Sequence, residues 1–273
     1  MNNKRIFTFW EPKTNLPAYL KLCMQTWQKF LPEYEVVILD YTNLDSWLGK
    51  NFFDESLFKN FSLPKQADAI RCAVLKKYGG IWMDCDTIIT SNKVRDFLNL
   101  DSNFVLIGCH VAFICANTKS FVLKNWLKGI QFRIKFYKEY HQNSKFSRFC
   151  LWLQSPFRYK KIVKNLEGWD FLGNGILGRV LYRVKRKPQE FLSVDKQANN
   201  IFPELTEYGT ISAKVYQQFY FENDFSEKVI KNDPGIILLH NSWTPKEYFQ
   251  MEEKEFFSYD NTMSCLLKKI LNH

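Results

Sequence analysis

The sequence lacks the features that place a protein outside the cell or across a membrane. Its seven cysteines are odd in number and form no Cys-X-X-Cys pair, so neither a disulfide framework nor a zinc site is indicated. The first residues contain no apolar stretch long enough for a signal peptide. The longest nearly apolar run, residues 104–116, is interrupted by His110 and is too short to span a bilayer. We therefore expect a protein of the reducing cytoplasm.

The chain also lacks zinc-finger, RNP-type and KH-type signatures, so we do not expect nucleic acid as its partner. A formal net charge of +10 nevertheless favours an anionic partner, either a phosphorylated substrate or an anionic lipid surface. The positive charge is concentrated between residues 124 and 164, where Glu139 is the only acid. The basic residues inside this segment include Lys128, Arg133, Lys135, Lys138, Lys145, Arg148, Arg158, Lys160 and Lys161.

Strands and helices alternate in the first part of the chain. Buried strands are expected over residues 6–10, 34–40, 81–83, 104–109 and 111–116. Helices are expected over residues 17–30, 44–61 (one or two short ones) and 64–78. This order predicts an α/β fold with a largely parallel sheet. The later part is expected to hold a helical segment over 121–166, a loop at 173–175, a helix over 176–184, a buried strand over 236–239 and a helical tail over 246–273.

Two carboxylates follow the expected strand at residues 81–83. In an open α/β sheet, ligands bind beyond the carboxyl ends of the strands, where Asp84 and Asp86 lie. If the segment is extended, both carboxylates share one face and Cys85 points to the other, into the core. Two carboxylates on one face repel each other unless a cation lies beside them, and oxygen ligands favour Mg²⁺ or Mn²⁺. The pair alone would also suit a solvated turn.

The expected helix at residues 64–78 carries Asp68 and Arg71 on one surface, because they are three positions apart. One interpretation is a local ion pair that contributes little if exposed. The other is a ligand site, in which the arginine binds a phosphate or sugar oxygen and the aspartate accepts from sugar hydroxyls. The helix leads directly into Gly79-Gly80 and the carboxylate pair, which favours the second interpretation.

These segments together resemble a known signature. The run Gln66–Arg71, then Leu75, then Tyr78–Asp86 resembles the signature of glycosyltransferase family 32, and it is similar to the related capsular polysaccharide synthesis proteins and to the catalytic domain of the large glucosylating toxins. Two weaker matches flank it. Residues 6–10 resemble the opening strand of the family, and Leu239–Trp243 resembles its closing His and Ser-Trp element.

The resemblance implies a GT-A fold, which is a Rossmann-like, mostly parallel sheet flanked by helices, and transfer with retention of configuration. Asp84 and Asp86 would contact a Mn²⁺ or Mg²⁺ ion and the ribose or diphosphate of a nucleotide sugar. Asp68 and Arg71 would hold the donor hexose. His240 would be a further ligand of the metal or the diphosphate.

By the same resemblance, Ser242 and Trp243 would close over the phosphates, and Thr8 and Trp10 would lie by the nucleotide base. The sequence departs from the family pattern at two places. His110 stands roughly where an asparagine is usual, and Gly173-Asn174-Gly175 replaces a Thr-Gly-Pro-like loop. Both regions would touch the donor sugar or the acceptor, so the acceptor stays open.

The resemblance also implies a domain organisation. One GT-A-like domain would span residues 1–273. Within it, 1–118 would form the nucleotide-sugar-binding core, 119–200 a basic helical insertion that faces the acceptor or a membrane, and 201–273 a C-terminal part that completes the donor site. The basic segment 121–164 is either a solvated helical insertion or a contact with an anionic membrane surface.

The expected function is a metal-dependent hexosyltransferase of surface polysaccharide synthesis, in the cytoplasm or peripheral on the inner face of the membrane. A UDP-sugar donor is favoured and GDP-mannose remains open, with a glycan or a polyprenyl-diphosphate-linked acceptor. The metal and Arg71 would neutralise charge on the departing nucleoside diphosphate. No carboxylate nucleophile is evident, which favours a same-face substitution. The alternatives are a metal-dependent nucleotide-sugar hydrolase and a non-catalytic glycan- or lipid-binding module.

Overall fold

The computed structural model describes residues 4–99, 101–107, 110–142, 148–149, 152–153, 156–194 and 212–272. Cys109, Cys150 and Lys145, together with parts of the segments 121–164, 119–200 and 201–273 considered above, lie outside these residues. Of His110 only the backbone is described.

The centre of the molecule is a six-stranded mixed sheet with the strand order β2-β1-β3-β6-β5-β7. Its strands are β1 (Arg5–Phe9), β2 (Glu35–Leu39), β3 (Gly80–Met83), β5 (Phe104–Ile107), β6 (His110–Ala116) and β7 (Leu192–Ser193). β1 pairs in parallel with β2 and β3, and β5 pairs in parallel with β7, whereas β6 is antiparallel to both β3 and β5. The expected α/β fold with a mostly parallel sheet is confirmed, and it is consistent with the GT-A arrangement that the resemblance implies.

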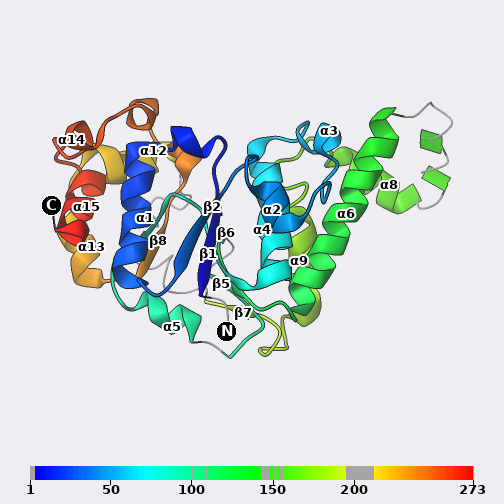
Figure 1. Ribbon diagram of the computed structural model, residues 1–273, viewed down its shortest axis with the longest axis horizontal. Coiled ribbons are helices and arrows are strands. Elements are labelled where there is room, and N and C mark those ends of the chain that lie inside the picture. Colours follow the sequence, from blue (N-terminus) through cyan, green and yellow to red (C-terminus); the bar gives the residue numbers. More distant parts are fainter. Residues whose placement is uncertain are drawn as a thin grey trace.

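Helices cover both faces of this sheet (Figure 1). On one side lie α1 (Ala18–Phe30), α13 (Ser226–Asn232) and α15 (Thr262–Leu271). On the other side lie α4 (Leu63–Tyr78), α6 (Phe121–Gln142) and α9 (Asn174–Val184), with α8 (Pro156–Lys164) beyond them. The helices predicted at 17–30 and 64–78 are confirmed. None of the helices in the described residues is both long enough and apolar enough to cross a membrane.

Alternate strand residues build two separate cores, as the two-residue period of a strand requires. Ile6 and Ile81 face the core beneath α1 and α15, whereas Phe7 and Trp82 face the core beneath α4 and α6. All four side chains are fully or almost fully buried. Burial on both faces fixes the register of β1 and β3, because a one-residue slip would exchange the two sets. The ends of these strands are thereby held in place.

A second, two-stranded sheet was not predicted in full. β4 (Thr87–Ile89) pairs antiparallel with β8 (Ile236–Leu238), and Thr87 lies opposite Leu238. β8 is the strand expected over 236–239, but β4 was not anticipated, because three residues carry no readable period. This pairing brings the segment after β8 beside the segment before β4. Residues 84–86 and 239–242 thus become neighbours in space.

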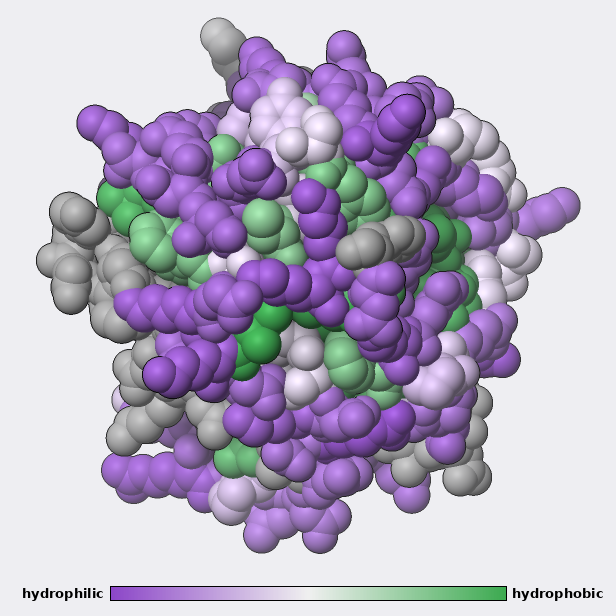
Figure 2. Space-filling model, turned by 90° about the vertical axis from the view of Figure 1, so that its left-hand side faces the viewer, coloured by the Kyte–Doolittle hydropathy of each residue, from purple (hydrophilic) through white to green (hydrophobic). Residues whose placement is uncertain are grey.

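Shorter elements complete the chain. They are α2 (Leu44–Leu48), α3 (Glu55–Phe58), α5 (Val94–Leu98), α12 (Ala213–Gln217) and α14 (Glu253–Phe256), 3-10 helices at Lys13–Asn15, Asn241–Trp243 and Lys246–Phe249, and a π-helix at Gln218–Glu222. α2 and α3 confirm the short helices expected over 44–61. The face seen in Figure 2 is mostly hydrophilic, with small hydrophobic patches separated by polar side chains.

Candidate functional site

A cavity of about 430 Å³ opens at the carboxyl ends of β1 and β3. This is where open α/β sheets bind their ligands. Three groups of residues line it: the first follows β1 and β3, the second lies on α4, and the third comes from later segments that fold back onto the sheet. In chain order the lining residues are Phe9, Trp10, Glu11, Leu63, Pro64, Ala67, Asp68, Arg71, Asp84, Cys85, Asp86, Val111, Ala112, Trp169, Asn174, Leu239, His240, Asn241 and Ser242.

Most of the residues predicted from the sequence meet in this cavity. Those that line it are Trp10, Asp68, Arg71, Asp84, Asp86, His240 and Ser242. Thr8 does not line it: the residue is fully buried, and its Oγ1 lies 3.1 Å from Cys85 Sγ. Trp243 does not line it either, and instead its ring lies 4.3 Å from the ring of His240. Thr8 and Trp243 therefore pack behind two lining residues, Cys85 and His240.

Residues 84–86 form a turn and not the extended segment that we expected. The amide of Thr87 donates to the carbonyl of Asp84 at 2.9 Å, which closes the turn before β4. Cys85 lines the cavity as well, and its Sγ lies 3.1 Å from Thr8 Oγ1 and 3.8 Å from the carbonyl oxygen of Phe9. Cys85 is nevertheless packed into the core, as expected. Burial raises the pKa of its thiol to about 12, so the thiol is protonated at neutral pH.

Asp84 is the more exposed of the two carboxylates and is held from one side only. Trp82 Nε1 donates to its Oδ1 at 2.7 Å, and Arg71 Nη2 lies 3.2 Å from the same oxygen. Arg71 belongs to α4 and Trp82 to β3. The carboxylate is thus fixed in orientation while it faces the cavity.

Asp86 is buried, and the late part of the chain holds it. The backbone amide of Asn241 donates to its Oδ2 at 2.7 Å. Burial and the nearby charge of Asp84 raise the pKa of Asp86 to about 7. The same asparagine accepts a hydrogen bond from the hydroxyl of Tyr19 through its side-chain oxygen. The pairing of β4 with β8 is what places Asn241 here.

Arg71 connects the acids of the site. Its Nε lies 3.5 Å from Asp68 Oδ1, and its Nη2 reaches Asp84. It also donates to the carbonyl of Val111, and its guanidinium lies 5.1 Å from the centre of the Trp82 ring. Asp68 and Arg71 are each only 5% exposed, which excludes the interpretation as a solvated surface pair. Burial raises the pKa of Asp68 to about 7 although Arg71 opposes this shift.

The segment 173–175 reaches the same site. It was expected to be a loop, but only Gly173 precedes α9, which begins at Asn174. A Cβ added to Gly173 would lie 2.0 Å from Asp68 Oδ2, so only glycine fits against this carboxylate. The next residue, Asn174, lines the cavity. Arg133 of α6 holds the segment by donating to the carbonyls of Phe171 and Gly175. The departure from the family pattern at this segment therefore lies at the cavity wall.

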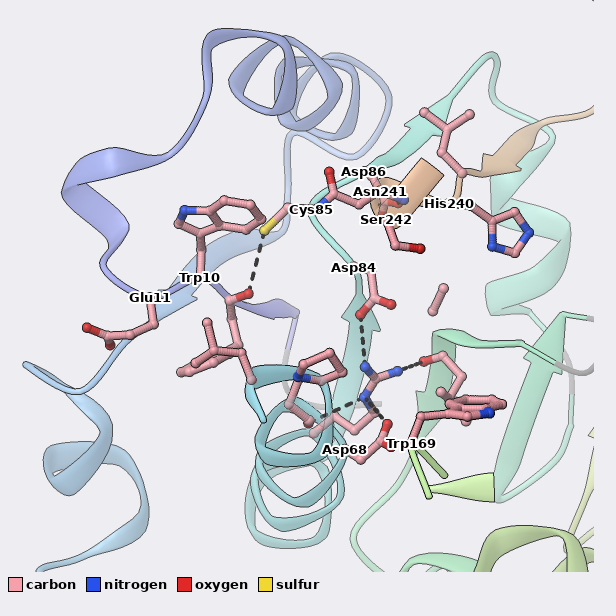
Figure 3. Close-up of a pocket in the computed structure, with 18 of the residues that line it drawn as sticks. Trp10, Glu11, Asp68, Asp84, Cys85, Asp86, Trp169, His240, Asn241 and Ser242 are labelled. Carbon is pink, nitrogen blue, oxygen red and sulfur yellow. Dashed lines mark hydrogen bonds and ion pairs between the residues drawn. The ribbon is translucent and has the colours of Figure 1, made fainter. Parts of the chain in front are cut away.

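His240 lies on the wall formed after β8 (Figure 3). It is half-buried, its backbone amide donates to the hydroxyl of Tyr216 at 3.4 Å, and its ring packs against Trp243. In the described part of the chain, no three His, Cys, Asp or Glu residues are grouped closely enough to hold a metal ion.

The donor chemistry of the two carboxylates nevertheless fits a divalent cation. Mg²⁺ and similar ions are usually bound by one or two carboxylates, with substrate phosphates and water completing the shell. Asp84 and Asp86 face one cavity, and their mutual repulsion contributes to the raised pKa of Asp86. A cation between them would relieve this repulsion.

Several lining residues were not predicted as site residues, among them Glu11, Trp169 and Asn241. Glu11 follows Trp10, and its carboxylate accepts from the amide of Tyr41 at 2.7 Å. Trp169 is 70% exposed although it is a large aromatic residue, and no sequence pattern marked it. Asn241 is part of the Leu239–Trp243 element. It contacts Asp86 through its backbone amide, and a sequence pattern does not reveal backbone contacts.

Comparison with known proteins gives one family. The family model described as "Capsular polysaccharide synthesis protein" matches residues 1–165. No curated protein matches the sequence significantly. Among solved structures, "PaToxG Glycosyltransferase" is similar with 14% identity and a TM-score of 0.36, over 69% of this chain and 86% of that chain.

Two structures of the glycosyltransferase GlyE from Streptococcus pneumoniae TIGR4 are also similar. One has 11% identity and a TM-score of 0.42, and the other, an apo form, has 13% identity and a TM-score of 0.41. Each match covers 100% of this chain but 64% of the GlyE chain, so this chain spans just under two thirds of GlyE.

Proposed function

This chain belongs to the family of capsular polysaccharide synthesis proteins, whose model matches more than half of its length, and from this membership we propose that it is a metal-dependent glycosyltransferase. It would transfer a hexose or N-acetylhexosamine from a nucleotide sugar, with UDP-sugars favoured, to a glycan or lipid-linked acceptor of surface polysaccharide synthesis. We expect the configuration of the sugar to be retained.

The observation that carries this proposal is the placement of Arg71 between two acids at the floor of the cavity. Arg71 holds Asp68 on one side and Asp84 on the other, and all three are cavity-lining residues. A guanidinium offers several directed donors, which suits a phosphate or sugar oxygen. Asp68 faces the cavity as an acceptor for sugar hydroxyls. This gives a cationic group for a diphosphate and an acidic group for a sugar within one pocket.

Asp84 and Asp86 are the residues that would hold Mn²⁺ or Mg²⁺ beside the diphosphate. The bound ion would supply positive charge against the diphosphate oxygens. His240 and Ser242 line the opposite wall and would face the diphosphate, with Trp243 supporting His240. Trp10 would lie by the base, and Thr8 would act through its contact with Cys85.

The chemistry expected of the protein is charge neutralisation and orientation. Arg71 would stabilise the negative charge that develops on the departing diphosphate, so no protein acid is needed to protonate it. The buried, sulfur-bearing Cys85 is not a candidate nucleophile because its thiol is protonated. We expect a same-face substitution, in which the departing phosphate assists in removing the proton of the acceptor hydroxyl.

The test is transfer by Asp84→Asn and Asp86→Asn. Purified protein would be incubated with a panel of nucleotide sugars and Mn²⁺, and release of the nucleoside diphosphate would be followed. We expect each variant to lose at least ~100-fold in rate while its melting temperature stays near that of the wild type. Asp96→Asn on α5 is the matched control, because Asp96 is exposed and lies outside the cavity.

Near-normal transfer by both variants in excess Mn²⁺ would overturn the proposed roles. Donor cleavage that no glycan acceptor accelerates would instead favour a nucleotide-sugar hydrolase. Absence of a thermal shift with UDP and Mn²⁺ would favour a non-catalytic binding module. The basic segment 121–164 would bring the enzyme to the inner face of the membrane, and loss of vesicle binding on charge reversal at Lys160 and Lys161 is the test for that role.

A further inference from the structure

A second cavity lies between α6, α8 and α9, on the side of the molecule away from α15 (Figure 1). Its volume is about 360 Å³, close to that of the candidate donor cavity. Four of its described lining residues are cations: Arg133, Lys161, Arg179 and Arg183. No Asp or Glu is found among those described lining residues. A concave surface with charge of one sign only favours a ligand of the opposite sign.

None of these four cations forms an ion pair with any residue in the described part of the chain. Arg133 is only 3% exposed, and the hydrogen bonds found for its side chain go to two carbonyl oxygens. Arg179 donates to the Gly175 carbonyl at 2.9 Å, the same oxygen that Arg133 reaches at 2.8 Å. Two guanidinium groups therefore converge on one neutral acceptor, which does not offset their repulsion.

The pKa of Arg133 is lowered to about 10 by burial and by the charge of Arg179, and Asp170 offsets only part of this effect. A buried arginine is normally paired with a carboxylate, because the desolvation of an isolated charge is costly. An anion in the cavity would supply the missing charge.

The floor of the cavity is apolar and closely packed. Ile162, Ile176 and Val180 are buried beneath the cations. α6 and α9 pack closely at this floor, since a Cβ added to Gly129 would lie 2.5 Å from Ile176 Cγ2. Phe132 lines the same cavity and is 49% exposed, which gives it an apolar edge. The cations are therefore presented from fixed backbones beside an apolar surface.

We propose that this cavity is a second anion site, separate from the donor cavity, which takes the phosphate or diphosphate group of a bound molecule. Lys161 and Arg183 are exposed and would contact the anion from α8 and from α9. Arg179 would contact it from α9 as well, one turn before Arg183. The site does not depend on the proposed transfer reaction, because none of these residues lines the donor cavity.

The two cavities share residues 173–175, which form the N-terminal end of α9. Gly173 lies against Asp68 and Asn174 lines the donor cavity, whereas the carbonyl of Gly175 is held by two cations of the basic cavity. An anion that engages Arg179 competes for the donors that hold these residues. An anion bound in the basic cavity is therefore expected to change the position of Gly173 and Asn174 at the wall of the donor cavity.

The test uses the full chain, inorganic diphosphate as the probe, and EDTA to remove divalent cations. Binding is measured by calorimetry for the wild type and for the double variant Lys161→Gln/Arg183→Gln. The matched control is Arg186→Gln/Lys187→Gln, which also removes one arginine and one lysine from exposed positions just beyond α9. We expect the first pair to weaken diphosphate binding about tenfold and the control pair to change it less than about twofold.

A second arm identifies the source of the phosphate. Co-sedimentation is measured with phosphatidylcholine vesicles that contain phosphatidic acid and with phosphatidylcholine alone. The site is supported and assigned to lipid-borne phosphate if less of the Lys161→Gln/Arg183→Gln variant than of the wild type sediments with the phosphatidic acid vesicles, and if diphosphate competes with the vesicles for the wild type. Unchanged sedimentation with weaker calorimetric binding supports the site and assigns it to a soluble phosphate. Failure of the wild type to bind diphosphate, or an equal loss in both pairs, overturns it.

Discussion

The contact between Gly173 and Asp68 offers a direct test of how the loop and α4 build the candidate site. In Gly173→Ala the added Cβ would lie 2.0 Å from Asp68 Oδ2 and 2.6 Å from its Cγ. An ordinary contact between such atoms is about 3.5 Å, so the loop or the carboxylate has to move by more than ~1 Å. The φ angle of Gly173 is −96°, which is not in the left-handed region that favours glycine, so the steric contact is the effect to be tested.

We expect Gly173→Ala to cost about 1–3 kcal/mol in the free energy of unfolding, as overpacking usually does. The Asp68–Arg71 pair would be displaced, so donor affinity should fall as well. Chemical denaturation gives the first quantity, and a thermal-shift titration with the nucleotide sugar and Mn²⁺ gives the second.

Gly178→Ala is the matched control, because Gly178 lies on α9, the helix that follows Gly173, and its added Cβ would meet nothing within 4 Å. It should be neutral or slightly stabilising, by up to ~1 kcal/mol. The double variant Gly173→Ala/Asp68→Ala removes the carboxylate that the new methyl group meets, so it should be about as stable as Asp68→Ala alone. Wild-type stability and donor affinity in Gly173→Ala, or strict additivity in the double variant, would refute the reasoning.

Further predictions concern the same cavity. Arg71→Lys keeps the charge but loses the directed donors, so the rate of transfer should fall at least ~10-fold with a small change in melting temperature. Arg71→Ala should lower the free energy of unfolding by roughly 3–5 kcal/mol, because Asp68 stays buried without its partner. Because burial raises the pKa of Asp68 above that of an unfolded chain, the folded protein binds this proton more tightly, and stability in EDTA should fall as the pH rises from ~4 towards about 7. That slope, followed by denaturation at several pH values, should be smaller in Asp68→Asn, and an unchanged slope would contradict the assignment. Trp169→Ala should raise the KM for the sugar substrates with almost no change in melting temperature, since the ring is 70% exposed, and a KM equal to the wild type would remove Trp169 from the site.

Much of the donor side of the site was predictable because it is local in sequence. The helix at 64–78, its end at Gly79 and the short strand after it follow one another without interruption, and each has its own pattern. Asp68, Arg71, Asp84 and the family resemblance could therefore be inferred together. The match of the family model confirms the resemblance to the capsular polysaccharide synthesis proteins.

The features that were missed depend on long-range contacts. The turn at residues 84–86 is closed by one hydrogen bond. β4 is a strand because it pairs with β8, which follows almost 150 residues later in the chain. The close approach of Gly173 to Asp68 is likewise a contact between two distant segments. Trp169 was missed because exposure is a property of the folded chain, and its neighbours Gly168 and Asp170 carry no pattern.

The β4–β8 pairing also has a consequence for how the protein is made. A ribosome delivers the carboxylates of residues 84 and 86 long before the amide of Asn241, which holds Asp86 and lies 155 residues after it in the chain. Until then the nascent chain carries two acids beside an open strand edge, without the wall formed by residues 239–242. The donor pocket therefore cannot be completed before residues 239–242 have been synthesised, and a product that ends between residues 86 and 239 would contain the motif but lack this wall.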